Sequence, residues 1–345
     1  MSSWFKLKEN INDYRKNGII DLDEYLSNNP EIPNFPYYLY GYDQKNFWTV
    51  VGKEDGDKSI YVKPRDYDYI DNEYNMYSEL LYAELMRQVG INTANLDIAM
   101  YNGHPTTISE NINESLSLDN FIIAGDELIG QKYYDITNNN SIEDLYDSIH
   151  EYCTMTCVPK EKEEKCIEDI KKVCIADIFT LSSSRTPQDL DFIAGMDENG
   201  NECLELAPLC TNTYALCSNL TKDEMIEMLE DDEILEERVD LCYTDTGVPE
   251  YKRDYNFPYW EDSLLYFVEE SEENLEFAKK CAEKMNIDEA IKNVERKIGD
   301  KIPSYYADFA RVIFDARTRQ ICSSLDLDYY KLMDNKYLEY EMEEI

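Results

Sequence analysis

The order of strand and helix signals between residues 40 and 112 constrains the fold of this chain most strongly. Residues 47–51 and 59–63 are rich in β-branched and aromatic residues, flank an acidic turn and predict a hairpin. Residues 73–89 carry apolar side chains at helical spacing, and a glycine follows them. Residues 96–109 predict a second hairpin around an Asn-Gly dipeptide, the strongest short hairpin signal. The sequence therefore predicts a small antiparallel sheet with one helix behind it.

From about residue 120 the pattern becomes mainly helical. Thr221 with Glu224, and Asn286 with Glu289, have the spacing of a capping box at a helix start. Residues 191–206 interrupt the helices with a strand, a turn and a returning strand. The fold class expected is α+β, with two lobes, and the chain divides into an N-terminal helical extension, a small lobe of sheet plus helix, and a mainly helical large lobe: residues 1–39, 40–125 and 126–345.

The charge balance limits the partners. The chain has 73 Asp and Glu against 33 Lys and Arg, a formal net charge of −40 at pH 7. Such a surface repels the phosphates of nucleic acids and anionic membranes, so we expect neither as a direct partner. It attracts basic proteins and speeds their association. Two interpretations stay open here: an acidic surface kept for solubility, and recognition of a basic protein partner.

The cysteine usage and the chain start indicate a compartment. Ten cysteines are scattered along the chain, and the start lacks the apolar core of a signal peptide. No stretch approaches the 18 apolar residues of a membrane-spanning helix. We therefore expect a cytoplasmic protein with reduced thiols.

One group of thiols resembles a metal site in its spacing. His150, Cys153 and Cys157 share a helical face, and Cys166 follows. These residues are candidate zinc ligands, but their spacing matches no compact zinc finger and Pro159 interrupts the run. Structural thiols are the favoured interpretation, and metal binding stays open.

Several short segments carry a resemblance to a known family. Tyr-Val-Lys-Pro at residues 61–64 ends a strand, and Glu79 lies in the helix that follows. Residues 182–189 precede a strand, and Leu-Ala-Pro-Leu begins the segment at 206–212. In this order the segments resemble HipA-like kinases, a family that includes toxin kinases of toxin–antitoxin pairs. The resemblance implies a two-lobed kinase fold, ATP and Mg²⁺ as possible cofactors, and Lys63 as a phosphate ligand that Glu79 positions.

The aligned catalytic positions depart from that family. Ser184 stands where the resemblance places the catalytic Asp, and Thr186 where it places a His. Asp189 replaces the metal-binding Asn, and Thr211 replaces the metal-binding Asp. A hydroxyl cannot act as a carboxylate base near neutral pH, and it is a weaker ligand for Mg²⁺. The alignment therefore predicts that no catalytic set is intact, with Asp189 and Asp191 as weak candidate metal ligands.

Two functions from different classes follow. The first is a pseudokinase that acts as an acidic scaffold or inhibitor of a basic partner, including one whose nucleic-acid-binding channel it occupies by mimicking phosphate charge. The alternative is an active ATP-dependent serine/threonine kinase or nucleotidyl transferase that modifies a protein. In that case Asp189 and Asp191 supply the metal ligand and the base from shifted positions.

Overall fold

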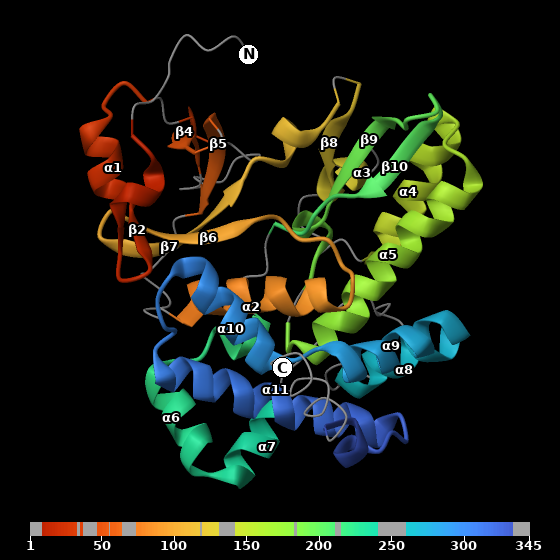
Figure 1. Cartoon of the computed structure of the whole chain (residues 1–345). Coiled ribbons are helices and arrows are strands. Elements are labelled where there is room, and N and C mark those ends of the chain that lie inside the picture. The colour runs from red at the N-terminus through yellow and green to blue at the C-terminus, as the bar shows by residue number, and fades with distance from the viewer. Residues whose placement is uncertain are drawn as a thin grey trace, which may run out of the picture.

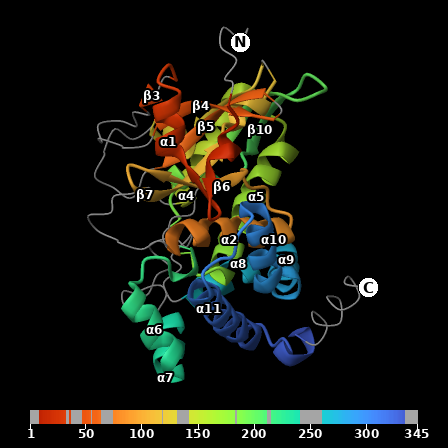
Figure 2. The same ribbon diagram turned by 60° about the vertical axis from the view of Figure 1, so that its left-hand side comes forward.

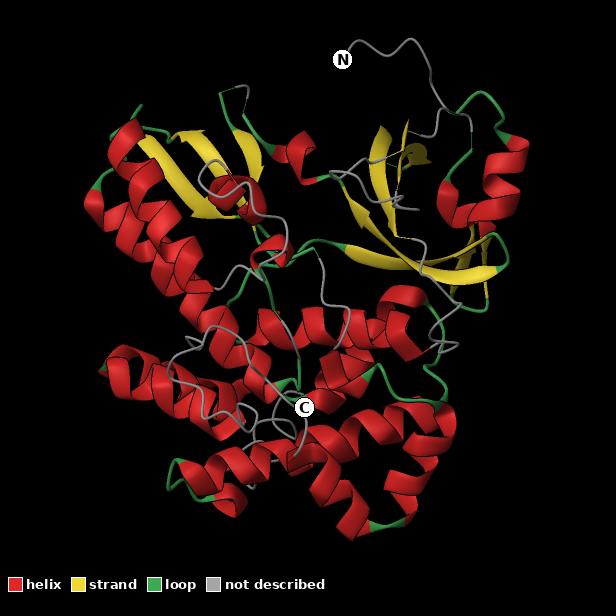
Figure 3. Ribbon diagram, turned by 180° about the vertical axis from the view of Figure 1, so that it is seen from behind, coloured by secondary structure: helices red, strands yellow, loops and turns green. Residues whose placement is uncertain are grey.

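A computed structural model of the chain shows two sheets and a mainly helical body (Figure 1). All strands lie toward one end of the molecule and most helices toward the other (Figure 3). The structure describes residues 9–32, 35–36, 47–54, 56–63, 74–117, 119–130, 142–182, 185–210, 215–240 and 260–333.

The larger sheet forms the small lobe. Its seven strands have the order β1-β2-β6-β7-β5-β4-β3, and all neighbours are antiparallel except β2 and β6. The predicted hairpins are β4–β5 and β6–β7, and Asn102 and Gly103 take positive φ values of 53° and 74° at the second turn. The strands are β1 (Arg15–Lys16), β2 (Ile19–Asp21), β3 (Phe35–Pro36), β4 (Phe47–Lys53), β5 (Gly56–Lys63), β6 (Leu96–Tyr101) and β7 (His104–Glu110).

The N-terminal segment differs from the helical extension that the sequence suggests. A 3₁₀ turn at Ile11–Tyr14 and helix α1 (Leu22–Asn28) flank the short strands β1 and β2, and β2 joins the sheet beside β6. Gly18 makes the turn between these strands at φ 79°, and a Cβ there would lie 2.8 Å from that of Asp300. This segment is therefore part of the small lobe, while the domain bounds themselves stay a prediction.

Helix α2 (Tyr74–Gln88) is the helix expected behind the sheet. Twelve of its 15 residues are buried, because β6 and β7 cover one side and α10 covers another (Figure 1). Gly90 follows at φ 89°, as predicted for a helix C-terminus. A helix enclosed in this way has a fixed position between the two lobes.

The large lobe combines a three-stranded sheet with helices. The sheet has the order β10-β9-β8 with antiparallel neighbours, and its β9–β10 hairpin was predicted. Helices α6 and α7 lie at the far end of the molecule from the sheets (Figure 2). The strands are β8 (Phe121–Ala124), β9 (Asp191–Met196) and β10 (Glu202–Leu206), and the helices are α3 (Gly125–Gly130), α4 (Ile142–Thr156), α5 (Lys160–Phe179), α6 (Lys222–Glu230), α7 (Asp232–Asp240), α8 (Trp260–Glu270), α9 (Glu272–Lys284), α10 (Ile287–Ile298) and α11 (Ser304–Ser324).

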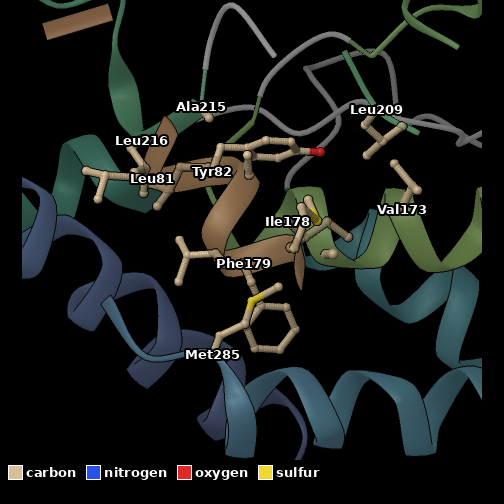
Figure 4. Packing of buried hydrophobic residues seen from close by; sticks show 14 of the residues in the cluster. Leu81, Tyr82, Val173, Ile178, Phe179, Leu209, Ala215, Leu216 and Met285 are labelled. Atoms are coloured by element: carbon tan, nitrogen blue, oxygen red, sulfur yellow. The ribbon is translucent and has the colours of Figure 1, made fainter. Parts of the chain in front are cut away.

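The main core lies where α2 meets α5. Every residue from 173 to 179 of α5 is buried, so this half of the helix has no solvent face. Tyr82 and Leu81 of α2 pack near Ile178 and Phe179 of α5 (Figure 4). One hydrophobic cluster therefore runs from the small lobe into the large lobe.

The predicted helix starts are found, with one difference. Thr221 and Glu224 form a complete capping box at α6. At α10 the Asn286 side chain accepts from the amides of residues 288 and 289, but its own N–H donates to Gln88 Oε1 at 2.6 Å. The capping box predicted that the Glu289 side chain would accept from the Asn286 N–H. Gln88 of α2 takes this place, and its bond links α10 to α2.

Among the described helices, none is both long and apolar enough to cross a membrane.

Candidate functional site: the cleft between the lobes

A cavity of about 500 Å³ opens between the two sheets. The small lobe contributes β5, β7 and the 3₁₀ turn Ile112–Ser115, and the large lobe contributes β8, α3, β9 and the segment after β10. Five carboxylates are among the described residues that line the cavity, and no Lys or Arg is. These carboxylates are Glu110, Asp126, Glu127, Asp189 and Asp191.

Lys63 lies at the end of β5, close behind the cleft. Its side chain is 9% exposed, and its ammonium lies 3.9 Å from Glu79 Oε2 of α2. The two candidate residues are therefore neighbours, as the resemblance implies. The same ammonium also donates a hydrogen bond to the backbone carbonyl of Cys210, just after β10. Lys63 thus bonds the small lobe to the large lobe.

Backbone hydrogen bonds reinforce this connection. The amide of Ala94 donates to the carbonyl of Leu209 at 2.9 Å, and the amide of Leu209 donates to the carbonyl of Asn92 at 3.0 Å. Residues 92–94 lead into β6 of the small lobe. The segment that ends at Cys210 is therefore bonded to the small lobe at two places.

Asp191, the first residue of β9, is half-buried in the cleft. Burial, together with the charges of Asp126 and Glu127, raises the pKa of its carboxyl to about 6 against the opposing charge of Lys63. A carboxyl with this pKa exchanges a proton near neutral pH, which is the property of a general acid or base.

Asp189 also lines the cleft, but its carboxylate has local partners. Its Oδ2 accepts from the backbone N–H of Thr186 at 2.8 Å and from the Thr186 hydroxyl at 3.0 Å. These bonds cap the 3₁₀ turn Pro187–Asp189. The structure therefore brings the candidate residues Asp189 and Asp191 to one cleft, with Thr186 bonded to the first of them.

A buried ion pair holds the chain next to the aligned catalytic position. The Arg185 Nε donates to Asp177 Oδ2 at 2.5 Å, and its Nη2 donates to Asp177 Oδ1 at 3.0 Å and to the Tyr82 hydroxyl at 2.7 Å. Asp177 lies on α5 and Tyr82 on α2. This network fixes the loop before β9 to both helices.

Two of the aligned positions, Ser184 and Thr211, lie outside the described residues. The thiol and imidazole candidates do not assemble a site: His150 pairs with Glu163 at 2.8 Å, while Cys153 and Cys166 are buried and Cys157 is exposed. In the described part of the chain, no group of three or more His, Cys, Asp or Glu side chains is placed to hold a metal ion.

The described lining of the cleft supplies no Lys or Arg for the phosphates of a nucleotide, while its carboxylates are of the type that ligates Mg²⁺. The Lys63 ammonium, which would contact such phosphates, is bonded to a carbonyl. Pairing of Lys53 with Gly56 leaves only residues 54 and 55 to connect β4 and β5, so this hairpin has no long loop to cover phosphates.

The sequence alone predicted no role for Asp126 or Glu127 and no pairing of Arg185 with Asp177. Asp126 and Glu127 directly follow an apolar strand signal at the start of a helix, and this position was the only available hint. Arg185 and Asp177 are separated by a turn, and nothing in their spacing distinguishes them from solvated charges.

Replacing Asp177 by Ala is expected to lower the free energy of unfolding by about 3–5 kcal/mol, because Arg185 would remain buried without its counter-charge. The control Tyr82→Phe removes only a hydroxyl and should cost about 1 kcal/mol. Chemical denaturation followed by circular dichroism measures both. Equal effects of the two substitutions would contradict the assigned importance of the ion pair.

The raised pKa of Asp191 predicts a pH dependence of stability. Between pH 3.8 and about 6 the folded state binds more protons at this carboxyl than the unfolded state, so its ionisation destabilises the fold as the pH rises. Asp191→Asn should therefore raise the melting temperature relative to wild type at pH 7.5 and have a smaller effect at pH 4. A melting-temperature difference independent of pH would show that the carboxyl is not perturbed.

No family model and no curated protein matches the chain by sequence. Among solved structures, the Helicobacter pylori proinflammatory kinase CtkA has a similar fold, with a TM-score of 0.59 and 11% identity over 88% of this chain and 96% of that one. HipA of Shewanella oneidensis MR-1, solved with HipB and operator DNA, matches at a TM-score of 0.47 and 12% identity, over 95% of this chain and 77% of that one. The chain thus has the predicted α+β, two-lobed, kinase-like fold.

Proposed function

We propose that this chain is a kinase-fold protein that does not transfer phosphate and that binds a basic partner protein. The observation that carries the proposal is the cleft itself: five carboxylates line it, and the nearby Lys63 donates to the Cys210 carbonyl. A triphosphate entering this cleft would meet no Lys or Arg in the described lining, because Lys63 is bonded to the Cys210 carbonyl.

The remaining candidate groups support the same proposal. Asp189 caps a turn through Thr186, which reduces its capacity as a metal ligand. Arg185 is buried against Asp177 and serves the packing of the loop. In both cases the contacts stabilise the fold, and neither requires a bound nucleotide.

The net charge of −40 supports the second half of the proposal. A basic protein would gain long-range attraction and faster association, and both effects weaken as salt screens the charges. An inhibitor that mimics phosphate charge in a nucleic-acid-binding channel is one form of such a protein.

An active transferase is the second candidate. It is favoured by the 3.9 Å approach of Lys63 to Glu79 and by Asp191, whose pKa of about 6 suits a general base. In that case Lys63 would exchange its carbonyl partner for a phosphate when a nucleotide binds.

Thermal denaturation with and without ATP and Mg²⁺ separates the two candidates. The proposal predicts no rise in melting temperature, whereas a ligand at one hundred times its Kd would stabilise the fold by about 2.7 kcal/mol. Lys63→Ala should lower the melting temperature equally with and without nucleotide. A nucleotide-dependent rise that Lys63→Ala abolishes, together with transfer of label to a protein, would establish the transferase instead.

Partner binding should depend strongly on salt. We expect the affinity for the purified basic protein recovered from the native host to fall about tenfold or more between 50 and 200 mM NaCl. Isothermal titration calorimetry at several salt concentrations measures this. An affinity that is unchanged across this range would overturn the electrostatic part of the proposal.

A further inference from the structure

Strand β8 has an open edge. It is the last strand in the order β10-β9-β8, and β9 pairs with one of its sides. No other described strand pairs with its second side. Among the described strands, none bonds to the backbone N–H and C=O groups on that side, and such an edge can pair with another extended chain.

The sequence of β8 lacks the usual protection of an open edge. It reads Phe-Ile-Ile-Ala, with no charged residue and no proline. Phe121 is 53% exposed, and Met196 at the end of β9 is 41% exposed. Natural edge strands are commonly blocked by Lys, Pro or a bulge, so an apolar edge of this kind is suited to pairing.

This edge borders the cleft between the lobes. Phe121, Ile122 and Ala124 line the same cavity as the five carboxylates. Asp126 and Glu127 follow β8 directly in the chain, and Asp191 pairs with Ala124 across the sheet. Backbone pairing groups and negative charge thus meet where β8 leads into α3.

We propose that an extended, lysine- or arginine-bearing segment of the partner protein adds to β8 as a further strand and places its cationic side chains among the carboxylates of the cleft. Alternate side chains of a strand point to the same side, so cations at every second residue would all face the carboxylates. This inference rests on the proposed function and gives it a binding site.

The charges favour a cationic occupant of this edge. A second copy of this chain would bring a further net charge of −40. A nucleotide would bring anionic phosphates into a cavity that five carboxylates line. Four residues of β8 span only about 13 Å, so backbone pairing alone is short and needs the added attraction of the charges.

The test uses the full chain and three capped octapeptides of alternating Lys and Thr. One peptide is unmodified, one is N-methylated at every Lys and one at every Thr. In a strand, the N–H groups of alternate residues face opposite sides, so only one of the two methylated peptides can lose its bonds to β8. We expect that peptide to bind at least about tenfold more weakly and the other to bind within about twofold of the unmodified one.

A matched pair of variants tests the position of the site. Asp126→Asn with Glu127→Gln removes two charges beside β8, and Glu230→Gln with Glu233→Gln removes two exposed charges at α6 and α7. Calorimetric titration should show a loss of about tenfold in affinity for the first double variant and a much smaller loss for the second.

Each other outcome has a defined meaning. Equal binding of both methylated peptides, or equal losses in the two double variants, would overturn strand addition at β8 and leave the acidic protein-binding function standing. Displacement of the peptide by ATP and Mg²⁺ would assign the cleft to a nucleotide. Failure of the unmodified peptide to bind would overturn the proposed site at β8. The proposed function would fail as well only if the affinity for the host partner also proved independent of salt.

Discussion

The hydrogen bond from the Lys63 ammonium to the Cys210 carbonyl connects the small lobe to the large lobe at the cleft. It joins the last residue of β5 to the segment after β10, and the bonds between Leu209 and residues 92 and 94 run beside it. Lys63 is buried next to Glu79, so its charge is balanced inside the protein. A lysine used in this way supports the junction of the lobes, and a phosphate would have to displace a bond that the fold already uses.

The negative lining of the cleft follows from the same arrangement. Lys63 is directed to a carbonyl, and Asp126, Glu127 and Asp191 line one cavity whose described lining contains no Lys or Arg. Burial and the charges of Asp126 and Glu127 raise the pKa of Asp191, although Lys63 opposes them. A cationic side chain from another protein would offset these negative charges. The cleft and the overall charge therefore both support the proposed basic partner.

The sequence predicted those parts of the structure that depend on local pattern. Both hairpins of the small lobe and helix α2 follow from periodicity and turn residues. Strand β2 did not, because it has only three residues and pairs with β6, far along the chain. The approach of Lys63 to Glu79 was expected from a family resemblance. The hydrogen bonds of Tyr82 join it to Asp177 and Arg185, which lie 95 and 103 positions further along the chain, and such bonds leave no local pattern. Contacts of that kind are fixed by packing, which a single sequence does not display.

Amide hydrogen exchange in wild type and in Lys63→Met measures whether the bond from Lys63 holds the two lobes together. Methionine keeps the apolar stem of the side chain but removes its hydrogen bond to Cys210. A hydrogen bond from a charged donor contributes about 1.5–3 kcal/mol to stability. The amides of Ala94 and Leu209 should therefore exchange about tenfold faster or more in the variant, while the β9–β10 hairpin keeps its protection. Unchanged protection of Ala94 and Leu209 would show that Lys63 does not hold the lobes together and is free to bind a phosphate.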